Sequence, residues 1–433
     1  MRRLRVQRPR LVRGKLFASR ERGIALVMVM IAISIILAIT NQFGTNANID
    51  MIAAANYRDQ MRAHFLARTA LNVSELVIRM QVELEKQFKG LDLTSYADQF
   101  MMAFCGNRAE ISEALGVPVE RLDGLGGDIG NCGLIPAITT DDSKINLNCA
   151  YSSNNKTFES LRDRLMSLLS FSAYDPVFDE GDAEAWRRNR ETQVAALLDY
   201  VDKDSLRMRD RGSTEDYGYE SLKDSYRAKQ NLLDTVGELR LVRGVDDRFW
   251  TLFGKAFTVY GGCKINLQAV DNVALLASIL RQAAENPTDP VLQDQQKLWL
   301  LATVIIKAQE FGQTFKDSDE FIDFVKDPAA AFSLPGQKGG PPPQIPGLPP
   351  GVKVGLALKK SELDPIVTFG ARITYRVTAW GEINRAQVDD KGNPIFPPVR
   401  RTITGVWDTG KTPQHVRKER EAGKGAWVFL KEE

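Results

Sequence analysis

The residues best suited to bind a ligand are acidic side chains between positions 199 and 216. The helical periodicity of apolar residues is lost over 197–222, where acids and glycines become frequent. Calcium binds six to eight hard oxygens in a flexible loop, and the segment offers enough of them, although its spacing is not that of an EF-hand. The candidate ligands are Asp199, Asp202, Asp204, Glu215 and Asp216, with Asp210 between them. The alternative is a solvated acidic loop whose charge is reduced by Arg207, Arg209 and Arg211.

Two other motifs match nucleotide-binding or DNA-binding patterns, and we expect neither to bind. Residues 405–412, GVWDTGKT, fit the P-loop expression G-x-x-x-x-G-K-[ST], but only residues 413–433 follow, fewer than the rest of a nucleotide-binding sheet needs. Residues 238–250, ELRLVRGVDDRFW, resemble a helix-hairpin-helix module. Asp246 and Asp247 stand where a phosphate would require positive potential, so we expect this hairpin to serve packing and protein contacts.

The sequence predicts neither an enzyme nor a zinc site. No G-x-S-x-G motif occurs, and neither His64 nor His415 has a plausible nucleophile beside it in sequence. The cysteines show no C-x-x-C spacing. In an oxidising compartment four cysteines allow two disulfides with three possible connectivities. The four are Cys105, Cys132, Cys149 and Cys263.

The element that would place these residues at a membrane is the run 24–40, IALVMVMIAISIILAIT. It contains no charged residue, and at ~1.5 Å of helical rise per residue it spans roughly 25 Å. Residues 1–23 carry nine Lys or Arg and one acid, which holds the N-terminus in the cytoplasm and sends the rest across. A nucleic-acid-binding arm is the alternative for this block, but the net charge of +2 provides no global basic field. No A-x-A-like site follows the run, so ordinary signal-peptide cleavage there is not expected.

The rest of the chain predicts a long helix, a mainly helical middle and late strands. Apolar residues continue at helical spacing over 41–90, with a loosening expected at Gly44. The tetrapeptide K-I-N-L occurs at 144–147 and again at 264–267, each copy near a cysteine, which suggests neighbouring strands. The alternating segments 369–383 and 400–408 predict a strand pair.

These segments resemble a known family. Arg22-Gly23 before Ile24, with an apolar helix that becomes amphipathic, resembles a class III prepilin signal. The order of LLDYVDKD, ELRLVRGV, KINLQAVDNVALLASIL and the strand pair is similar to the GspK family of large minor pseudopilins of bacterial type II secretion. The resemblance covers roughly residues 24–408.

The resemblance implies a pilin-like α+β fold, in which a long N-terminal helix packs on a small antiparallel sheet interrupted by a large α-helical insertion. Residues 128–150 and 256–269 would then be pilin strands. The resulting divisions are a cytoplasmic leader 1–23, a transmembrane helix 24–40, its amphipathic extension 41–90, a first pilin part 91–150, the insertion 151–255, a pilin strand with further helices 256–332, a Pro/Gly-rich linker 333–351, closing strands 352–410 and a charged, poorly ordered tail 411–433.

The resemblance also assigns site residues. A prepilin peptidase would cut between Gly23 and Ile24. Most pilins carry Glu at the fifth mature position, where it is thought to be offset by the N-terminal amine of a neighbouring subunit, but Met28 stands there. A subunit without this carboxylate suits the end of a filament. The alternative is an ordinary single-span anchor in which Met28 has no special meaning. Related pseudopilins bind calcium in the helical domain, which favours the acidic site.

Two pairings and three functions follow as hypotheses. If the two K-I-N-L strands lie side by side, Cys149 pairs with Cys263 and Cys105 with Cys132. The first function is a minor pseudopilin at the tip of the type II secretion pseudopilus, which helps initiate assembly and export of folded proteins across the outer membrane. It would span the inner membrane once with its bulk in the periplasm. Its partners would be other minor pseudopilins, the major pseudopilin, prepilin peptidase and the inner-membrane assembly platform, without nucleic acid. The alternatives are a type IV pilus minor pilin or tip adhesin, and a membrane-anchored helix-hairpin-helix DNA-binding protein.

Overall fold

The structure is a computed structural model, and it describes residues 21–87, 92–105, 112, 130–135, 137–152, 154–179, 189–204, 215–216, 218–220, 224–328, 354–383, 397–410 and 425–433. Several predicted features therefore lie outside the described residues. They are the leader up to residue 20, Asp210 with its neighbouring arginines, the linker 333–351, Lys411, Thr412 and His415.

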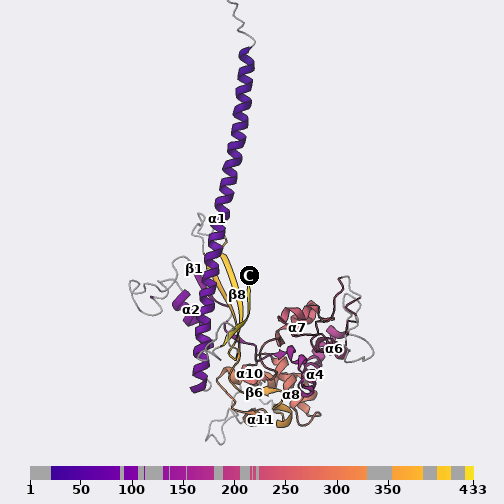
Figure 1. The fold of residues 1–433 in the computed structure, drawn as a ribbon. Helices are drawn as coiled ribbons and strands as arrows, with labels where there is room; N and C mark the ends of the chain where they lie inside the picture. Colours follow the sequence, from indigo (N-terminus) through magenta and orange to yellow (C-terminus); the bar gives the residue numbers. More distant parts are fainter. Residues whose placement is uncertain are drawn as a thin grey trace, which may run out of the picture.

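The N-terminal part of helix α1 (Glu21–Gln87) projects from the molecule as an exposed stalk, and its C-terminal part belongs to the globular part (Figure 1). The helix contains 67 residues and is therefore roughly 100 Å long at ~1.5 Å per residue. Every large apolar side chain from Ile24 to Phe43 is more than half exposed. It is long and apolar enough to cross a membrane, as the sequence predicts. The helix continues through Gly44 without a break, so the expected loosening there is wrong.

The second half of α1 packs on a five-stranded antiparallel sheet (Figure 1). The strand order is β1–β7–β8–β9, and β2 also pairs with β7. The strands are β1 (Gly130–Leu134), β2 (Thr139–Thr140), β7 (Thr374–Ile383), β8 (Val399–Asp408) and β9 (Ala426–Glu432). β7 and β8 pair over their whole length, which confirms the strand pair predicted from their alternation. The predicted α+β class, in which a long N-terminal helix packs on an antiparallel sheet interrupted by a helical part, is confirmed.

Two expectations about this sheet are wrong. The tail 411–433 was expected to be poorly ordered, yet β9 lies within it and pairs with β8. Trp427 explains this, because its ring packs edge-on against Trp407 at 5.2 Å and its Nε1 donates a hydrogen bond to Glu75 on α1 at 3.0 Å. The second error concerns residues 256–269, whose strands β4 (Phe257–Thr258) and β5 (Ile265–Asn266) belong to two separate two-stranded sheets.

Helix α1 approaches β7 closely because the contact point on the strand is a glycine. A Cβ at Gly381 would lie 2.2 Å from the Ala63 carbonyl oxygen and 2.4 Å from the Ala67 nitrogen. Both are backbone atoms of α1, so no side-chain rotation could relieve the overlap. The small residues on both elements therefore set the distance between the helix and the sheet.

Replacing Gly381 with alanine should lower the free energy of unfolding by about 1–3 kcal/mol, the usual cost of overpacking. The methyl group would force α1 away from β7. Urea denaturation followed by circular dichroism measures the change. Gly262→Ala is the matched control, because nothing lies within 4 Å of its Cβ position. Equal unfolding midpoints for the two variants would contradict this account of the contact.

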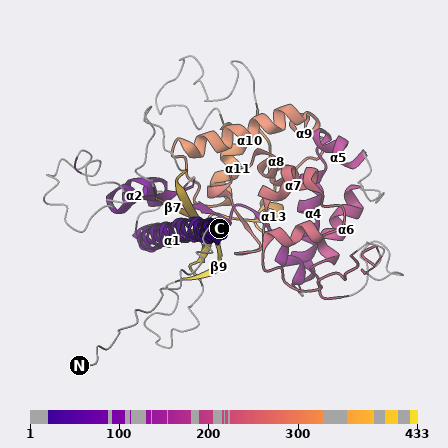
Figure 2. The ribbon, with the colours of Figure 1, turned by 90° about the horizontal axis from the view of Figure 1, so that it is seen from above.

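Between β2 and β7 the chain forms a helical part that lies to one side of α1 (Figure 2). The helices outside α1 are η1 (Leu93–Tyr96), α2 (Ala97–Cys105), η3 (Leu147–Tyr151), α4 (Asn155–Leu169), η4 (Ser172–Tyr174), α5 (Asp175–Asp179), α6 (Arg190–Asp199), η5 (Val236–Leu241), α7 (Asp247–Phe253), η6 (Gly254–Ala256), η7 (Leu267–Ala269), α8 (Val273–Ala283), α9 (Pro290–Gln293), α10 (Gln295–Glu310), α11 (Ser318–Lys326) and α13 (Lys360–Leu363). The short strands here are β3 (Ile145–Asn146), β4, β5 and β6 (Val367–Thr368).

The helical part consists of two units built on the same plan, and each begins with one K-I-N-L copy. In the first, β3 pairs in parallel with β4; in the second, β5 pairs in parallel with β6. The asparagine of each copy caps the 3₁₀ helix that follows it, through Asn148 N–H in the first and Gln268 N–H in the second. The two copies are therefore equivalent positions of a repeat, and the expectation that they form neighbouring strands is wrong.

The two units share one hydrophobic core, which runs from Ile145 to Val367. The helical part thus extends well beyond the expected insertion 151–255 and includes the described residues of 270–368. A separate core lies between α1 and the sheet, and contains Val77 and Tyr375. One disulfide joins Cys105 to Cys132 beside this second core, and another joins Cys149 to Cys263 at the base of the first helical unit.

Candidate metal centre

The end of α6 presents two acidic side chains on one tight turn. Asn189 caps the start of this helix by accepting a hydrogen bond from Thr192 N–H at 2.7 Å. Asp199 is the last helical residue, and the N–H of Asp202 returns to the Leu198 carbonyl at 3.0 Å. The turn is held in place by buried apolar neighbours, namely Leu197, Leu198, Tyr200 and Val201.

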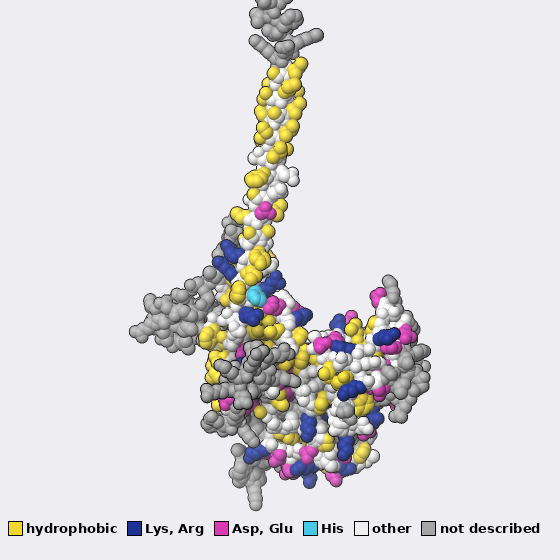
Figure 3. All heavy atoms as spheres, viewed as in Figure 1, with side chains coloured by type: hydrophobic (Ala, Val, Ile, Leu, Met, Phe, Trp, Pro, Cys, Tyr) yellow, Lys and Arg dark blue, Asp and Glu magenta, His cyan; other side chains and the backbone are white. Residues whose placement is uncertain are grey.

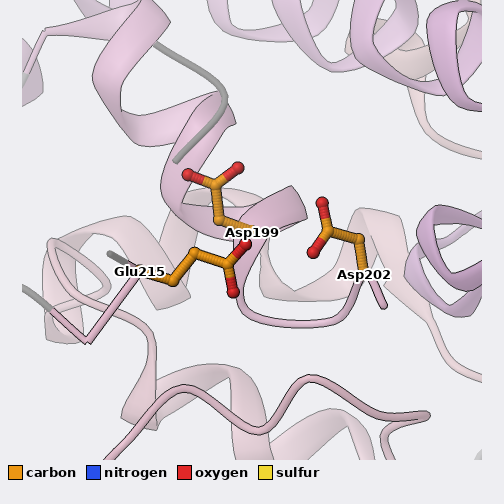
Figure 4. A group of neighbouring side chains, drawn as sticks. All are labelled: Asp199, Asp202 and Glu215. Carbon is orange, nitrogen blue, oxygen red and sulfur yellow. The ribbon is translucent and has the colours of Figure 1, made fainter. Parts of the chain in front are cut away.

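Glu215 completes the group from a different segment. One carboxylate oxygen from each of Asp199, Asp202 and Glu215 lies within 4.8 Å of the other two, and all three residues are buried. Figure 4 shows the three side chains directed toward one another. Asp202 Oδ1 and Glu215 Oε1 are buried without a hydrogen-bond partner. Two hard oxygens of the group are thus buried without a protein donor, and such oxygens suit a calcium ion.

Gln230 positions Glu215, and nothing in the sequence indicates this role. Its side-chain amide donates a hydrogen bond to Glu215 Oε2 at 3.2 Å, and its backbone N–H donates to the Tyr200 carbonyl at 3.0 Å. It has a φ of 48°, a left-handed conformation that a non-glycine residue adopts at a cost. The strained residue thus connects the turn after α6 to the segment that carries Glu215.

Burial and mutual repulsion disfavour charge on the group. Burial raises the pKa of Asp202, and the nearby Asp204 adds to the effect, while a hydrogen bond with Glu215 opposes it. Burial also raises the pKa of Glu215, followed by the charges of Asp202 and Asp199. A divalent cation would reverse this balance, because it stabilises the ionised form of every ligand.

Two of the five predicted ligands lie outside this group. Asp204 is exposed, and its charge contributes to the raised pKa of Asp202. Asp216 turns toward another segment, where its carboxylate accepts a hydrogen bond from Ala228 N–H at 3.1 Å and approaches Arg227 at 3.9 Å. Sequence spacing alone could not separate these residues from the three that converge.

The remaining motifs have packing roles in the described residues. Gly405 lies inside β8 between Val377 and Leu430, so the P-loop match begins in mid-strand and provides no phosphate-binding loop there. In the helix-hairpin-helix segment, the Arg240 guanidinium lies 5.1 Å from the Trp250 ring and 3.4 Å from Asp247. Arg240, one of the three arginines of this segment, is therefore engaged within the hairpin.

The predicted processing residues lie on the stalk. The Gly23–Ile24 bond falls near the start of α1, and nothing lies within 4 Å of a Cβ placed at Gly23. Ile24 is 60% exposed and Met28 is 65% exposed. The bond and the fifth position are therefore both accessible to a membrane protein.

Comparison with known proteins gives one match to a family model. Residues 143–261 match the family described as type II secretion system (T2SS), protein K. No curated protein matches the chain. Among solved structures, the chain is similar to the crystal structure of the GspK-GspI-GspJ complex from the enterotoxigenic Escherichia coli type 2 secretion system. The identity is 12%, the match covers 89% of this chain and 99% of that chain, and the TM-score is 0.49. A likeness at this level supports no argument about function.

Proposed function

We propose that the whole chain is a minor pseudopilin of a type II secretion system, because residues 143–261 match the family model of type II secretion system protein K. It would help initiate pseudopilus assembly and so support export of folded proteins across the outer membrane. We propose a structural rather than a catalytic role, with one span in the inner membrane and the bulk of the chain in the periplasm.

The observation that carries this proposal is the two-part character of α1. Figure 3 shows the upper part of the helix covered by hydrophobic side chains and free of charged ones, whereas charged side chains gather where it meets the head. The lower part packs on the sheet through buried residues such as Ala63, Ala67 and Ala70. One rigid helix thus connects a lipid-compatible segment to a folded head, as a subunit that leaves a membrane to join a filament requires.

The lower part of α1 also has an apolar face turned away from the sheet, which supports assembly through this helix. The exposed side chains are separated by four, eleven and four positions, and eleven residues are close to three helical turns, so they share one face. They are Met61, Phe65, Leu76 and Met80, each at least 38% exposed. We propose that other minor pseudopilins and the major pseudopilin pack against this face. Prepilin peptidase and the inner-membrane assembly platform would act on the segment before and within the membrane.

N-terminal sequencing of the purified chain tests the proposal. Co-expression with a prepilin peptidase should give a product that begins at Ile24, because the residue before the cut is Gly23. Gly23→Val should leave the leader in place, and Gly14→Val, a leader glycine far from the bond, should be processed like the unaltered chain. An intact leader on the unaltered chain in the presence of the peptidase would refute the proposal.

We also propose a position at the filament end. Met28 offers no carboxylate to a neighbouring amine, which favours a place where no further subunit is added above it. Quantitative mass spectrometry of sheared filaments should then find this chain in a small minority relative to the major pseudopilin. Comparable amounts of the two would exclude a place at the end. A type IV pilus minor pilin would give the same result, and the identity of the co-purified major subunit distinguishes the two.

Calcium is the proposed ligand of Asp199, Asp202 and Glu215. The support is the buried, convergent arrangement of three carboxylates, two of which carry an oxygen without a hydrogen-bond partner. Binding there would hold the turn after α6 against the segment of Glu215. We propose no nucleic-acid binding, because Asp246 and Asp247 stand where a phosphate would require positive potential, and Asp247 and Trp250 engage Arg240.

A further inference from the structure

The helical part and the sheet meet at one small junction. The chain passes from β2 to β3 through residues 141–144, and it returns from β6 to β7 through residues 369–373. The connection between the two helical units, residues 259–264, reaches the same place. Asn146 Nδ2 donates hydrogen bonds to the carbonyls of Tyr260 at 3.1 Å and Gly261 at 2.9 Å. Neighbouring domains usually move relative to each other unless their interface is large and apolar, so the contacts at this junction decide its stiffness.

Asp141 connects three elements through one buried carboxylate. The side chain is fully buried, and it accepts hydrogen bonds from Arg376 on β7 at 2.5 and 3.0 Å. Lys144 at 2.7 Å and the Thr258 hydroxyl at 2.9 Å complete its partners. Burial alone would raise the pKa of Asp141, but Arg376 and Lys144 lower it to about 2. The carboxylate therefore stays ionised, and its bond to Arg376 fixes the first crossing to the sheet.

Asp142 fixes the second crossing. Its carboxylate accepts hydrogen bonds from the backbone N–H groups of Ile373 and Thr374, the latter at 3.0 Å, and from the Thr374 hydroxyl at 2.6 Å. Its own carbonyl accepts the N–H of Asn266 at 2.7 Å, at the start of the second helical unit. Asp142 thus connects the crossing at 141–144, the crossing at 369–373 and the second helical unit.

Packing around the two acids leaves little room for bending. Gly261 has a φ of +80°, and a Cβ there would lie 3.0 Å from Asp142 Oδ1. The ring of Tyr260 lies 5.8 Å from the Arg376 guanidinium and 5.9 Å from the ring of Phe429 on β9. The connection between the units is therefore packed against the arginine that Asp141 holds and against β9.

We propose that Asp141 and Asp142 form a rigid joint that holds the helical part at a fixed angle to α1 and the sheet. If the chain is a pseudopilin, which is the proposed function above, the joint transmits displacement of the stalk directly to the helical part. Without the joint, the two peptide crossings would act as a hinge and absorb that displacement.

Pulsed electron paramagnetic resonance on the full chain in detergent micelles tests the joint. Ketone-bearing amino acids at Phe311 and Val428, both exposed, carry labels on the helical part and on β9 without disturbing the disulfides. The unaltered chain should give one narrow distance distribution. Asp141→Asn with Asp142→Asn should broaden it about twofold or more, as expected for domains free to move. Asp163→Asn, an exposed acid that contacts Arg162, is the control and should match the unaltered chain.

A broad distribution in the unaltered chain, or an unchanged one in the double variant, would overturn the proposal. If the double variant fails to fold, Thr374→Val removes one partner of Asp142 and leaves both acids in place. Hydrogen exchange should then accelerate in residues 370–376 and not in α8; equal rates in both segments of variant and unaltered chain would also overturn it. These readouts do not depend on secretion, so failure of the joint and failure of the proposed function give different results.

Discussion

Replacing Cys149 and Cys263 together with serine should lower the free energy of unfolding of the helical part by about 5 kcal/mol. The disulfide closes a loop whose ends are 114 residues apart, and the chain-entropy model gives about 5 kcal/mol for a loop of this length. It joins Cys149 in η3, at the start of the first helical unit, to Cys263, two residues before β5, where the second unit begins. Loss of this disulfide should therefore release η3, at the start of the first unit, from its covalent link to the second unit.

Urea denaturation followed by helical circular dichroism measures this loss. Cys105→Ser with Cys132→Ser is the matched control, because its loop is shorter, with ends 27 residues apart, and it lies beside the sheet. The same model gives about 4 kcal/mol for that loop, which should appear in the transition of the sheet and α1. An unfolding midpoint of the helical part that the first double variant leaves unchanged would contradict the prediction.

Calcium should raise the unfolding temperature of the chain, and Glu215→Gln should abolish most of the rise. A ligand that binds the folded state at 100 times its dissociation constant adds about 2.7 kcal/mol of stability. Asp199 ends α6 and Asp202 lies on the turn after it, whereas Glu215 comes from a different segment. Without the Glu215 carboxylate, the ion can no longer bridge that segment to the turn. Differential scanning calorimetry with calcium, and with magnesium as a second ion, measures the shift.

Asp204→Asn is the matched control for this experiment. Asp204 was among the ligands expected from the sequence, but it is exposed and lies outside the converging group. Its variant should keep the calcium response of the unaltered chain. If the two variants respond alike, the three converging carboxylates are not the site.

The pH dependence of the same site has a definite sign. Without metal, the folded-state pKa values of Asp202 and Glu215 are raised above their usual range near 4. Their contribution to stability is therefore present at acidic pH and is lost as the pH rises through the raised values. Calcium removes this loss, so its stabilising effect should be larger at pH 8 than at pH 5. Calorimetry at the two values, with and without calcium, checks the sign, and a larger effect at pH 5 would contradict it.

Local patterns in the sequence predicted the elements that depend on local physics. The apolar run after Gly23 predicted the stalk, and the alternation of 369–383 and 400–408 predicted β7 and β8. The acidic segment gave Asp199, Asp202 and Glu215, but spacing could not separate them from Asp204 and Asp216. Which of the acids converge depends on the hydrogen bonds that Gln230 donates to Tyr200, in the turn after α6, and to Glu215. These contacts join segments that are distant in the sequence.

The remaining errors have the same origin. The two K-I-N-L copies were identified correctly, but we expected them to form neighbouring strands. They occupy equivalent positions in two separate sheets, and the sequence alone does not distinguish a structural repeat from a pair of adjacent strands. The sequence does not reveal the role of residues 141–142, because their partners on β7 lie more than 230 positions away in the chain. The many charged residues around β9 predicted a poorly ordered tail, because the hydrogen bond that Trp427 donates to Glu75, 352 positions away, is not visible in the sequence.

The strand order has a consequence for how the chain folds as it emerges. The helical part is complete once residue 368 is available, since β6 is its last strand. The sheet needs β1 at 130–134 and β9 at 426–432 together, so its closure waits for nearly all of the sequence. Chains emerge N-terminus first, and non-local pairings form slowly. The helical part should therefore acquire protease resistance while α1 still lacks its sheet, so the buried face of the lower half of α1 stays uncovered until synthesis is nearly complete.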